Sequence, residues 1–142
     1  MKLTFIFSIF ATFSANCAQF ENKTVNFQRF AAALAKVESN NNPKAHNIRE
    51  DARGLLQVRA NYFKDAQKFD KELARFGHND CFNKQVAIRV FYSYCSRYEP
   101  LALKNGDWET LARLHNAGWN WKAKRSATNN YWRKVKKALT LI

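Results

Sequence analysis

Apolar residues recur three or four positions apart along most of this chain, which is the spacing of one face of an α-helix. The pattern predicts helices over residues 25–39, 60–70, 83–97, 108–117 and 128–139. One polar stretch, residues 40–54, contains Asn-Asn-Asn-Pro and cannot continue a helix, so we expect a loop or a small β-hairpin there. The sequence therefore predicts a mostly α (or α+β) fold with about five helices.

Polar residues mark the expected helix ends. Asp80, Asp107 and Thr128 stand where the last three helices should be N-capped, and Gly118 can close the 108–117 helix in a left-handed conformation. In the last helix the pattern turns Val135 and its apolar neighbours inward. The same pattern turns the charged residues outward, namely Lys134, Lys136 and Lys137.

The length of 142 residues fits one domain that can bury its own core. The charge is strongly unbalanced, with 24 Lys and Arg against 11 Asp and Glu, giving a net charge of +13. Such a domain is attracted to anionic polymers, although no motif that reads nucleic-acid bases is visible. We expect a monomer with no specific nucleic-acid partner.

The N-terminus has the layout of a secretory signal peptide. Lys2 precedes an apolar run over residues 3–13, and small residues follow up to Ala18. The run is shorter than the roughly 20 residues that a membrane span needs, which argues against the alternative of an anchor. We therefore expect a signal peptide at 1–18 and one folded domain at 19–142. The mature protein should be secreted or extracytoplasmic, in a periplasm, the extracellular space or a lysosome-like compartment, with no membrane span.

Cys81 and Cys95 are the cysteines left after that cleavage. The helix expected between them holds them about 20 Å apart, whereas a disulfide needs Cα atoms within about 7 Å. We expect two free thiols. No Cys or His spacing resembles a metal site, and no cofactor is expected.

Glu38 is the first candidate catalytic residue. It closes the first helix beside Ser39 and faces the polar stretch. The negative end of the helix dipole disfavours a charged carboxylate, and a carboxyl that keeps its proton can serve as a general acid. An ordinary solvated glutamate is the alternative.

Glu50 and Asp51 follow in the polar stretch, which can return past the end of the first helix. Two carboxyl groups about 5–10 Å apart are the arrangement that cleaves glycosidic bonds. Either residue could be the second carboxylate, or both could simply pair with Arg49 or Arg53.

His115 and Asn116 end the 108–117 helix. His115 could act as a base, but no Ser or Cys nucleophile stands in a recognisable motif, so a triad hydrolase is not indicated. Trp119, Trp121 and Tyr131 could stack on a sugar or fill the core.

These segments together resemble the lysozyme-like superfamily. Residues 35–39 (Ala-Lys-Val-Glu-Ser) and 54–58 (Gly-Leu-Leu-Gln-Val) are similar to the Glu-Ser and Gly-Leu-Met-Gln signature of soluble lytic transglycosylases. The remainder is closer to the invertebrate-type, destabilase-like lysozymes. Four segments resemble motifs of that family in register: 54–65, 94–98, 112–118 (Ala-Arg-Leu-His-Asn-Ala-Gly) and 128–135 (Thr-Asn-Asn-Tyr-Trp-Arg-Lys-Val).

The resemblance implies a lysozyme-like fold and cleavage of the β-1,4 bond between N-acetylmuramic acid and N-acetylglucosamine in peptidoglycan. It gives Glu38 the role of proton donor. Aligning the second carboxylate from Gly54 leads to Asn47, whereas aligning it from Glu38 leads to Glu50. The substrate-binding residues expected along the groove are Ser39, Asn47, Gln57, Tyr62, His115, Asn116 and Tyr131. The disulfides of the family are absent, and Ala117 and Trp119 stand where it has Gly and Pro.

Three functions stay open at this point. A muramidase would use Glu38 as acid with Glu50 or Asp51 as partner. A lytic transglycosylase would use Glu38 alone and release 1,6-anhydromuramyl products. A basic protein could instead bind wall polymers or other polyanions without catalysis.

Overall fold

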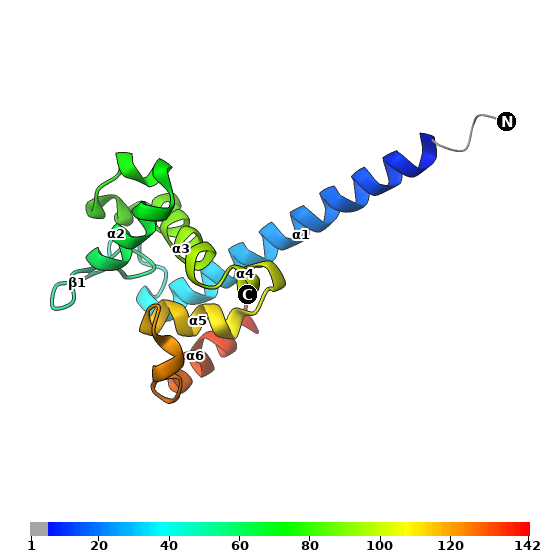
Figure 1. The fold of residues 1–142 in the computed structure, drawn as a ribbon. Coiled ribbons are helices and arrows are strands. Elements are labelled where there is room, and N and C mark those ends of the chain that lie inside the picture. Colours follow the sequence, from blue (N-terminus) through cyan, green and yellow to red (C-terminus); the bar gives the residue numbers. More distant parts are fainter. Residues whose placement is uncertain (1–5) are drawn as a thin grey trace.

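The computed structural model describes residues 6–142, with side chains at Glu21 and from residue 24 onward. Its first helix, α1 (Ile6–Ser39), projects from the body of the molecule (Figure 1). The predicted end of this helix is confirmed, but its predicted start at residue 25 is wrong. No glycine or proline occurs between residues 6 and 39, so nothing in the sequence stops the helix from starting earlier.

The predicted signal peptide at 1–18 falls partly on residues 1–5, which lie outside the described residues, and it stays a prediction. Over the part of the chain that the structure describes, none of the helices combines the length and the apolar character needed to cross a bilayer.

A small antiparallel sheet follows α1. Its strands are β1 (His46–Asn47), β2 (Ala52–Arg53) and β3 (Val58–Arg59), in the order β1-β2-β3. His46 pairs with Arg53, and Ala52 pairs with Arg59. The expected hairpin is therefore present, with a third strand added to it. At Gly54 a Cβ atom would lie 1.9 Å from the Cys81 carbonyl oxygen, so this close approach requires glycine.

The middle of the chain forms α2 (Ala60–Phe69), two 3₁₀ turns, η1 (Lys71–Arg75) and η2 (His78–Phe82), and α3 (Lys84–Tyr98). The helix predicted at 60–70 is confirmed. The predicted cap of α3 is wrong: the Asn83 side chain accepts hydrogen bonds from the backbone of Gln85 and Val86, whereas Asp80 accepts one from Gly77. Phe82 is the last residue of η2 and precedes α3.

Helix α4 (Pro100–Asn105), which the sequence analysis did not predict, precedes α5 (Trp108–Ala117). Asp107 caps α5 as predicted, accepting a hydrogen bond from the backbone of Thr110. Gly118 has the expected positive φ of +79°, but its ψ of −171° lies outside the left-handed helical region, in a conformation that essentially only glycine adopts.

The chain ends with η3 (Trp121–Lys124), η4 (Ser126–Thr128) and α6 (Asn129–Leu139). Thr128 directly precedes α6, but its hydroxyl does not cap the helix. The hydroxyl donates to the Arg125 carbonyl and accepts from the buried Arg113 guanidinium, which draws it toward α5.

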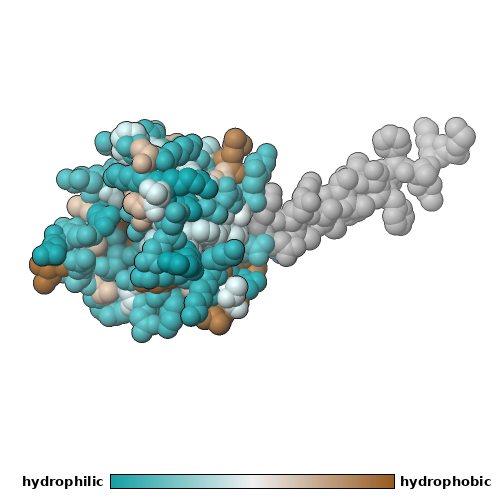
Figure 2. All heavy atoms as spheres, turned by 90° about the horizontal axis from the view of Figure 1, so that it is seen from below, coloured by the Kyte–Doolittle hydropathy of each residue, from teal (hydrophilic) through white to brown (hydrophobic). Residues whose placement is uncertain are grey.

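The core is formed mainly by residues of α1, α2, α3, α5 and α6 together with Leu55, Leu56 and Val58. Phe30 is fully buried and stacks on Trp108, with 4.8 Å between ring centroids. Val135 of α6 is buried while Lys134, Lys136 and Lys137 are exposed, as predicted. The face shown in Figure 2 is mainly hydrophilic over the coloured residues.

Cys81 and Cys95 are both buried and unpaired, which confirms the predicted free thiols. Burial raises the pKa of Cys81 to about 12 and that of Cys95 well above its ordinary value.

Candidate active site

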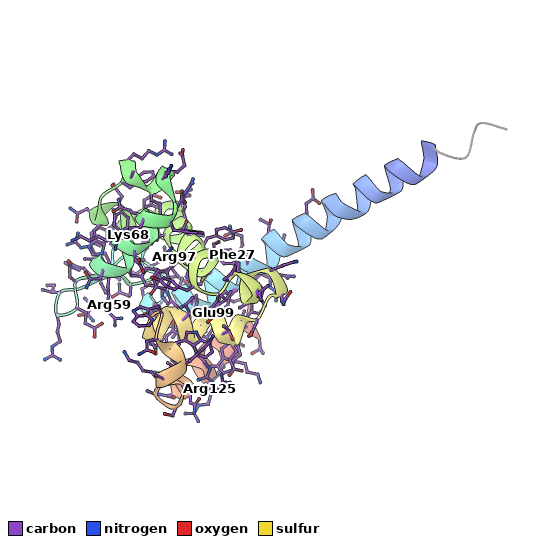
Figure 3. The ribbon with its side chains drawn as sticks, viewed as in Figure 1. Phe27, Arg59, Lys68, Arg97, Glu99 and Arg125 are labelled. Atoms are coloured by element: carbon purple, nitrogen blue, oxygen red, sulfur yellow. The ribbon has the colours of Figure 1, made fainter. Side chains whose placement is uncertain are left out.

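A cleft of about 140 Å³ opens between the end of α1, the small sheet and the end of α5. Arg59 contributes to its sheet side (Figure 3). Its walls are formed by Glu38, Asn47, Glu50, Ala52, Gln57, Arg59, His115 and Asn116. The structure thus brings six of the predicted site residues together. A larger hollow of about 1390 Å³ beside α1, α3 and α4 is lined by none of them.

Glu38 lies on the last turn of α1, where Asn40 and Asn41 take positive φ values of 54° and 63° and turn the chain back toward the sheet. Its side chain is 19% exposed. The Tyr131 hydroxyl, from the first turn of α6, donates a hydrogen bond to Glu38 Oε1 at 2.5 Å. Burial, followed by the nearby Glu38 carboxylate, raises the pKa of Tyr131 well above its ordinary value, so this phenol remains a donor.

His115 is a largely buried residue in the wall of the cleft. Its Nε2 atom lies 3.0 Å from the Leu56 carbonyl oxygen and 3.5 Å from Glu38 Oε1. A carbonyl oxygen only accepts, so Nε2 carries the hydrogen, and Nδ1 accepts from the Tyr62 hydroxyl at 3.3 Å. Burial lowers the pKa of His115 despite the opposing effect of Glu38, so the ring is neutral near pH 7.

The lowered pKa of His115 predicts a loss of stability in mild acid. The unfolded chain binds this proton near pH 6.5, whereas the folded chain resists it. The contribution of neutral His115 to the free energy of unfolding is therefore complete above pH 6.5. It is lost as the pH falls toward the folded-state pKa of His115, by at most about 1.4 kcal/mol per pH unit. Urea unfolding between pH 8 and pH 5 measures this slope. We expect a clearly flatter profile for His115→Gln, and equal slopes for both proteins would contradict the assignment.

Glu50 belongs to the connection between β1 and β2, and Arg59 on β3 provides its counter-ion. The Arg59 Nε atom donates to Glu50 Oε2 at 3.0 Å, and the second contact of the guanidinium is to the same oxygen. Glu50 lines the cleft, and its Oε1 atom takes no part in the contacts with Arg59. The groups that contact Glu38 are neutral, so the two carboxyl groups of the cleft have different electrostatic surroundings.

Asp51 is adjacent to Glu50 in sequence but has other partners. It lies 2.7 Å from Arg53 Nη2, 3.2 Å from His46 Nε2 and 3.6 Å from His78 Nδ1. The hydrogen bond from Arg53 is the main cause that lowers the pKa of Asp51. Asp51 is not among the residues that line the cleft, and its contacts fasten the β1–β2 connection to η2.

Ser39 also lies outside the cleft lining. Its hydroxyl donates to the Leu55 carbonyl at 2.9 Å and so fastens the end of α1 to the segment before β3. Tyr62 stands behind His115 and stacks on Tyr94, with 3.7 Å between ring centroids. Neither of these two predicted residues lines the cleft. Ser39 holds the end of α1 in place, and Tyr62 supports the His115 ring.

Three side-chain amides line the cleft. Gln57, held at a φ of 49°, donates through Nε2 to the carbonyls of Gly54 and Ala45 at 2.8 and 3.2 Å. Asn47 Oδ1 accepts from the Glu50 backbone at 3.4 Å. The Asn116 side chain forms no hydrogen bond with any residue of the described chain, so its donors and acceptor are available to a ligand.

Sequence reasoning missed Arg59 and Ala52. Arg59 reaches Glu50 because β2 pairs with β3, and strands of two residues carry no periodicity from which that pairing could be read. The opposite charges of Glu50 and Arg59 were the one available signal.

Among the described residues, no cluster of His, Cys, Asp or Glu side chains has the arrangement of a metal site. No curated protein and no solved structure matches the sequence. The sequence model of one family, Destabilase, matches residues 28–138, from the middle of α1 to the end of α6. This range contains the whole cleft and the motifs on which the resemblance rests, and the chain therefore belongs to the destabilase family of lysozyme-like, invertebrate-type proteins.

Proposed function

We propose that this protein is a peptidoglycan-cleaving muramidase, with Glu38 as general acid and Glu50 as the second carboxylate. The observation that carries the proposal is that one cleft holds both carboxyl groups in different surroundings. Arg59 balances the charge of Glu50, while Glu38 contacts only the neutral Tyr131 hydroxyl and His115 ring.

The contacts of Glu38 indicate which of its oxygens donates the proton. Oε1 accepts from Tyr131 and lies near the Nε2 hydrogen of His115. In the acid role, Oε2 would then be the oxygen that passes a proton to the glycosidic oxygen as the bond breaks. Tyr131 stabilises the carboxylate left behind, since its hydroxyl already donates to Oε1.

Glu50 supplies negative charge on the other side of the reacting sugar. Through Oε1 it would activate a water molecule or stabilise the developing positive charge at the anomeric carbon. Arg59 keeps the carboxylate oriented. The amides of Asn47, Gln57 and Asn116 suit the acetamido and hydroxyl groups of the glycan, because amides both donate and accept hydrogen bonds.

The products of purified peptidoglycan test the proposal. Mass spectrometry should find reducing muramic acid ends, because water is the acceptor in a hydrolase. Products with 1,6-anhydro ends would show a lytic transglycosylase instead. If pure, folded protein gives no products, the remaining function is non-catalytic binding of anionic polymers.

The charge distribution predicts that wall lysis is sensitive to salt. Residues 110–142 contain eight Lys and Arg and no Asp or Glu. The exposed lysines of α6 face an anionic wall, and salt near 0.5 M screens such attraction beyond about 4 Å. We expect clearance of wall suspensions to fall severalfold between 0.05 and 0.5 M salt, following the screening of long-range attraction.

A soluble, uncharged oligomer of N-acetylglucosamine is the matched control substrate. Its cleavage rate should change little over the same salt range, because it offers no charge to attract. Equal salt dependence for both substrates would show that salt acts on the cleft itself.

A further inference from the structure

Trp119 differs from the other tryptophans of the chain in its surroundings. The described chain contains all four tryptophans, and Trp108, Trp121 and Trp132 lie in the core or pack against it. Trp121, for example, is 4% exposed, and its Nε1 atom donates to Glu99 (labelled in Figure 3) at 2.9 Å. Trp119 is 68% exposed. A large apolar ring is thus presented to solvent directly after α5.

The backbone that carries this ring is held in place. Gly118 takes a φ of +79° and a ψ of −171°, a conformation open essentially to glycine, and so fixes the turn out of α5. The Trp119 backbone N–H then donates to the Tyr94 hydroxyl at 3.2 Å. Tyr94 is itself 4% exposed and stacks on Tyr62. The backbone that carries the indole is therefore anchored to a buried tyrosine.

Trp119 is connected to residues of the cleft from two directions. Asn116, which lines the cleft, precedes Trp119 by three residues, a span of at most about 11 Å. From the other direction, Tyr62 joins the Tyr94 ring to His115, which also lines the cleft. Trp119 is not one of the residues that line the cleft, but its Cα lies within about 11 Å of that of Asn116, which does line it.

We propose that Trp119 is a sugar-binding platform on which a pyranose ring of the glycan stacks, next to the bond that is cleaved. This inference rests on the proposed function. A chair-form pyranose such as N-acetylglucosamine has equatorial hydroxyls and a flat face of C–H bonds, which is the shape that an exposed indole can cover. Stacking removes both faces from water, while the Asn116 amide is free to bind the polar edge of the same chain.

Steady-state cleavage of soluble peptidoglycan fragments tests the platform. Trp119→Ala should raise KM by about five- to tenfold, the fold-change that corresponds to the loss of one aromatic stack. We expect kcat within about twofold and an unchanged melting temperature, since the ring supports no core contact. Trp119→Tyr should recover most of the affinity because it restores an aromatic face.

Phe69→Ala is the matched control. Phe69 is 48% exposed and lines the larger hollow beside α1, α3 and α4, away from the cleft. An equal effect of Trp119→Ala and Phe69→Ala on KM would overturn the proposal that Trp119 binds a sugar. A Trp119→Ala variant with a lower melting temperature and an unchanged KM would overturn it as well.

The two proposals can fail separately. If the wild-type protein cleaves the fragments and Trp119→Ala leaves KM unchanged, the platform alone is wrong. If the wild-type protein does not cleave them, the muramidase assignment is wrong. Titration with a hexamer of N-acetylglucosamine then tests by itself whether Trp119 binds a sugar. Binding should change the indole fluorescence of the wild-type protein and be lost in Trp119→Ala, and its retention there would refute stacking.

Discussion

Glu38→Gln should reduce wall lysis by about a hundredfold to ten-thousandfold, the usual contribution of a general acid. Glutamine has the shape of glutamate and keeps an oxygen that can accept the hydrogen bond from Tyr131, so the site should stay assembled. What it lacks is a proton that can be transferred to the glycosidic oxygen. Turbidity clearance of wall suspensions measures the loss, and thermal unfolding shows that the fold is intact.

Glu72→Gln provides the comparison for this experiment. Glu72 is a surface glutamate whose side chain is 65% exposed, and its nearest cation, Arg75, is 4.0 Å away. The same chemical change there should leave lysis unaltered. Lysis by Glu38→Gln within threefold of the wild type would exclude Glu38 as the acid.

Glu50→Gln should lower kcat by about a hundredfold, at the lower end of the effects expected for a group that assists proton transfer. The amide oxygen can still accept from Arg59, so the variant removes the negative charge with little change in shape. The KM for soluble fragments should change less than kcat, because the charge matters most when the anomeric carbon becomes positive.

Asp51→Asn separates the two candidates for the second carboxylate. Asp51 contacts Arg53, His46 and His78 and does not line the cleft, so neutralising it should lower the melting temperature while kcat stays within about threefold. Asparagine also tolerates the φ of +46° found at this position. The reverse pattern, with Asp51→Asn inactive and Glu50→Gln active, would move the role to Asp51. Activity of both variants with anhydro products would favour a transglycosylase.

Much of the fold could be predicted because its helices carry strong local signals. Helix α5 begins after Asp107 and ends before Gly118, as the sequence predicts. The apolar spacing also identified the buried face of α6. The N-terminal extent of α1 could not be predicted, since a helix without glycine or proline shows no start of its own. Asp80 and Asn83 are both good capping residues, and only the packing of η2 decides between them.

The site was predictable as a set of residues and not as a geometry. Glu38, His115 and Asn116 stand at helix ends, where side chains tend to converge in space. Which of Glu50 and Asp51 is the candidate second carboxylate depends on the pairing of β2 with β3, which are two residues long each. Their register places Arg59 beside Glu50, whereas Asp51 pairs with Arg53. The strand pairing that decides between Glu50 and Asp51 is a feature of tertiary structure, and no local sequence pattern predicts it.

The two buried thiols have a consequence for where this domain can fold. Cys81 and Cys95 are held as uncharged thiols inside the core, and an uncharged thiol is a poor nucleophile in disulfide exchange. No cross-link between them contributes to the stability of the native state, and apolar packing around Phe30 and Val135 supplies it instead. The domain should therefore reach the same native state in a reducing cytosol as in an oxidising medium, without an oxidant or a disulfide isomerase.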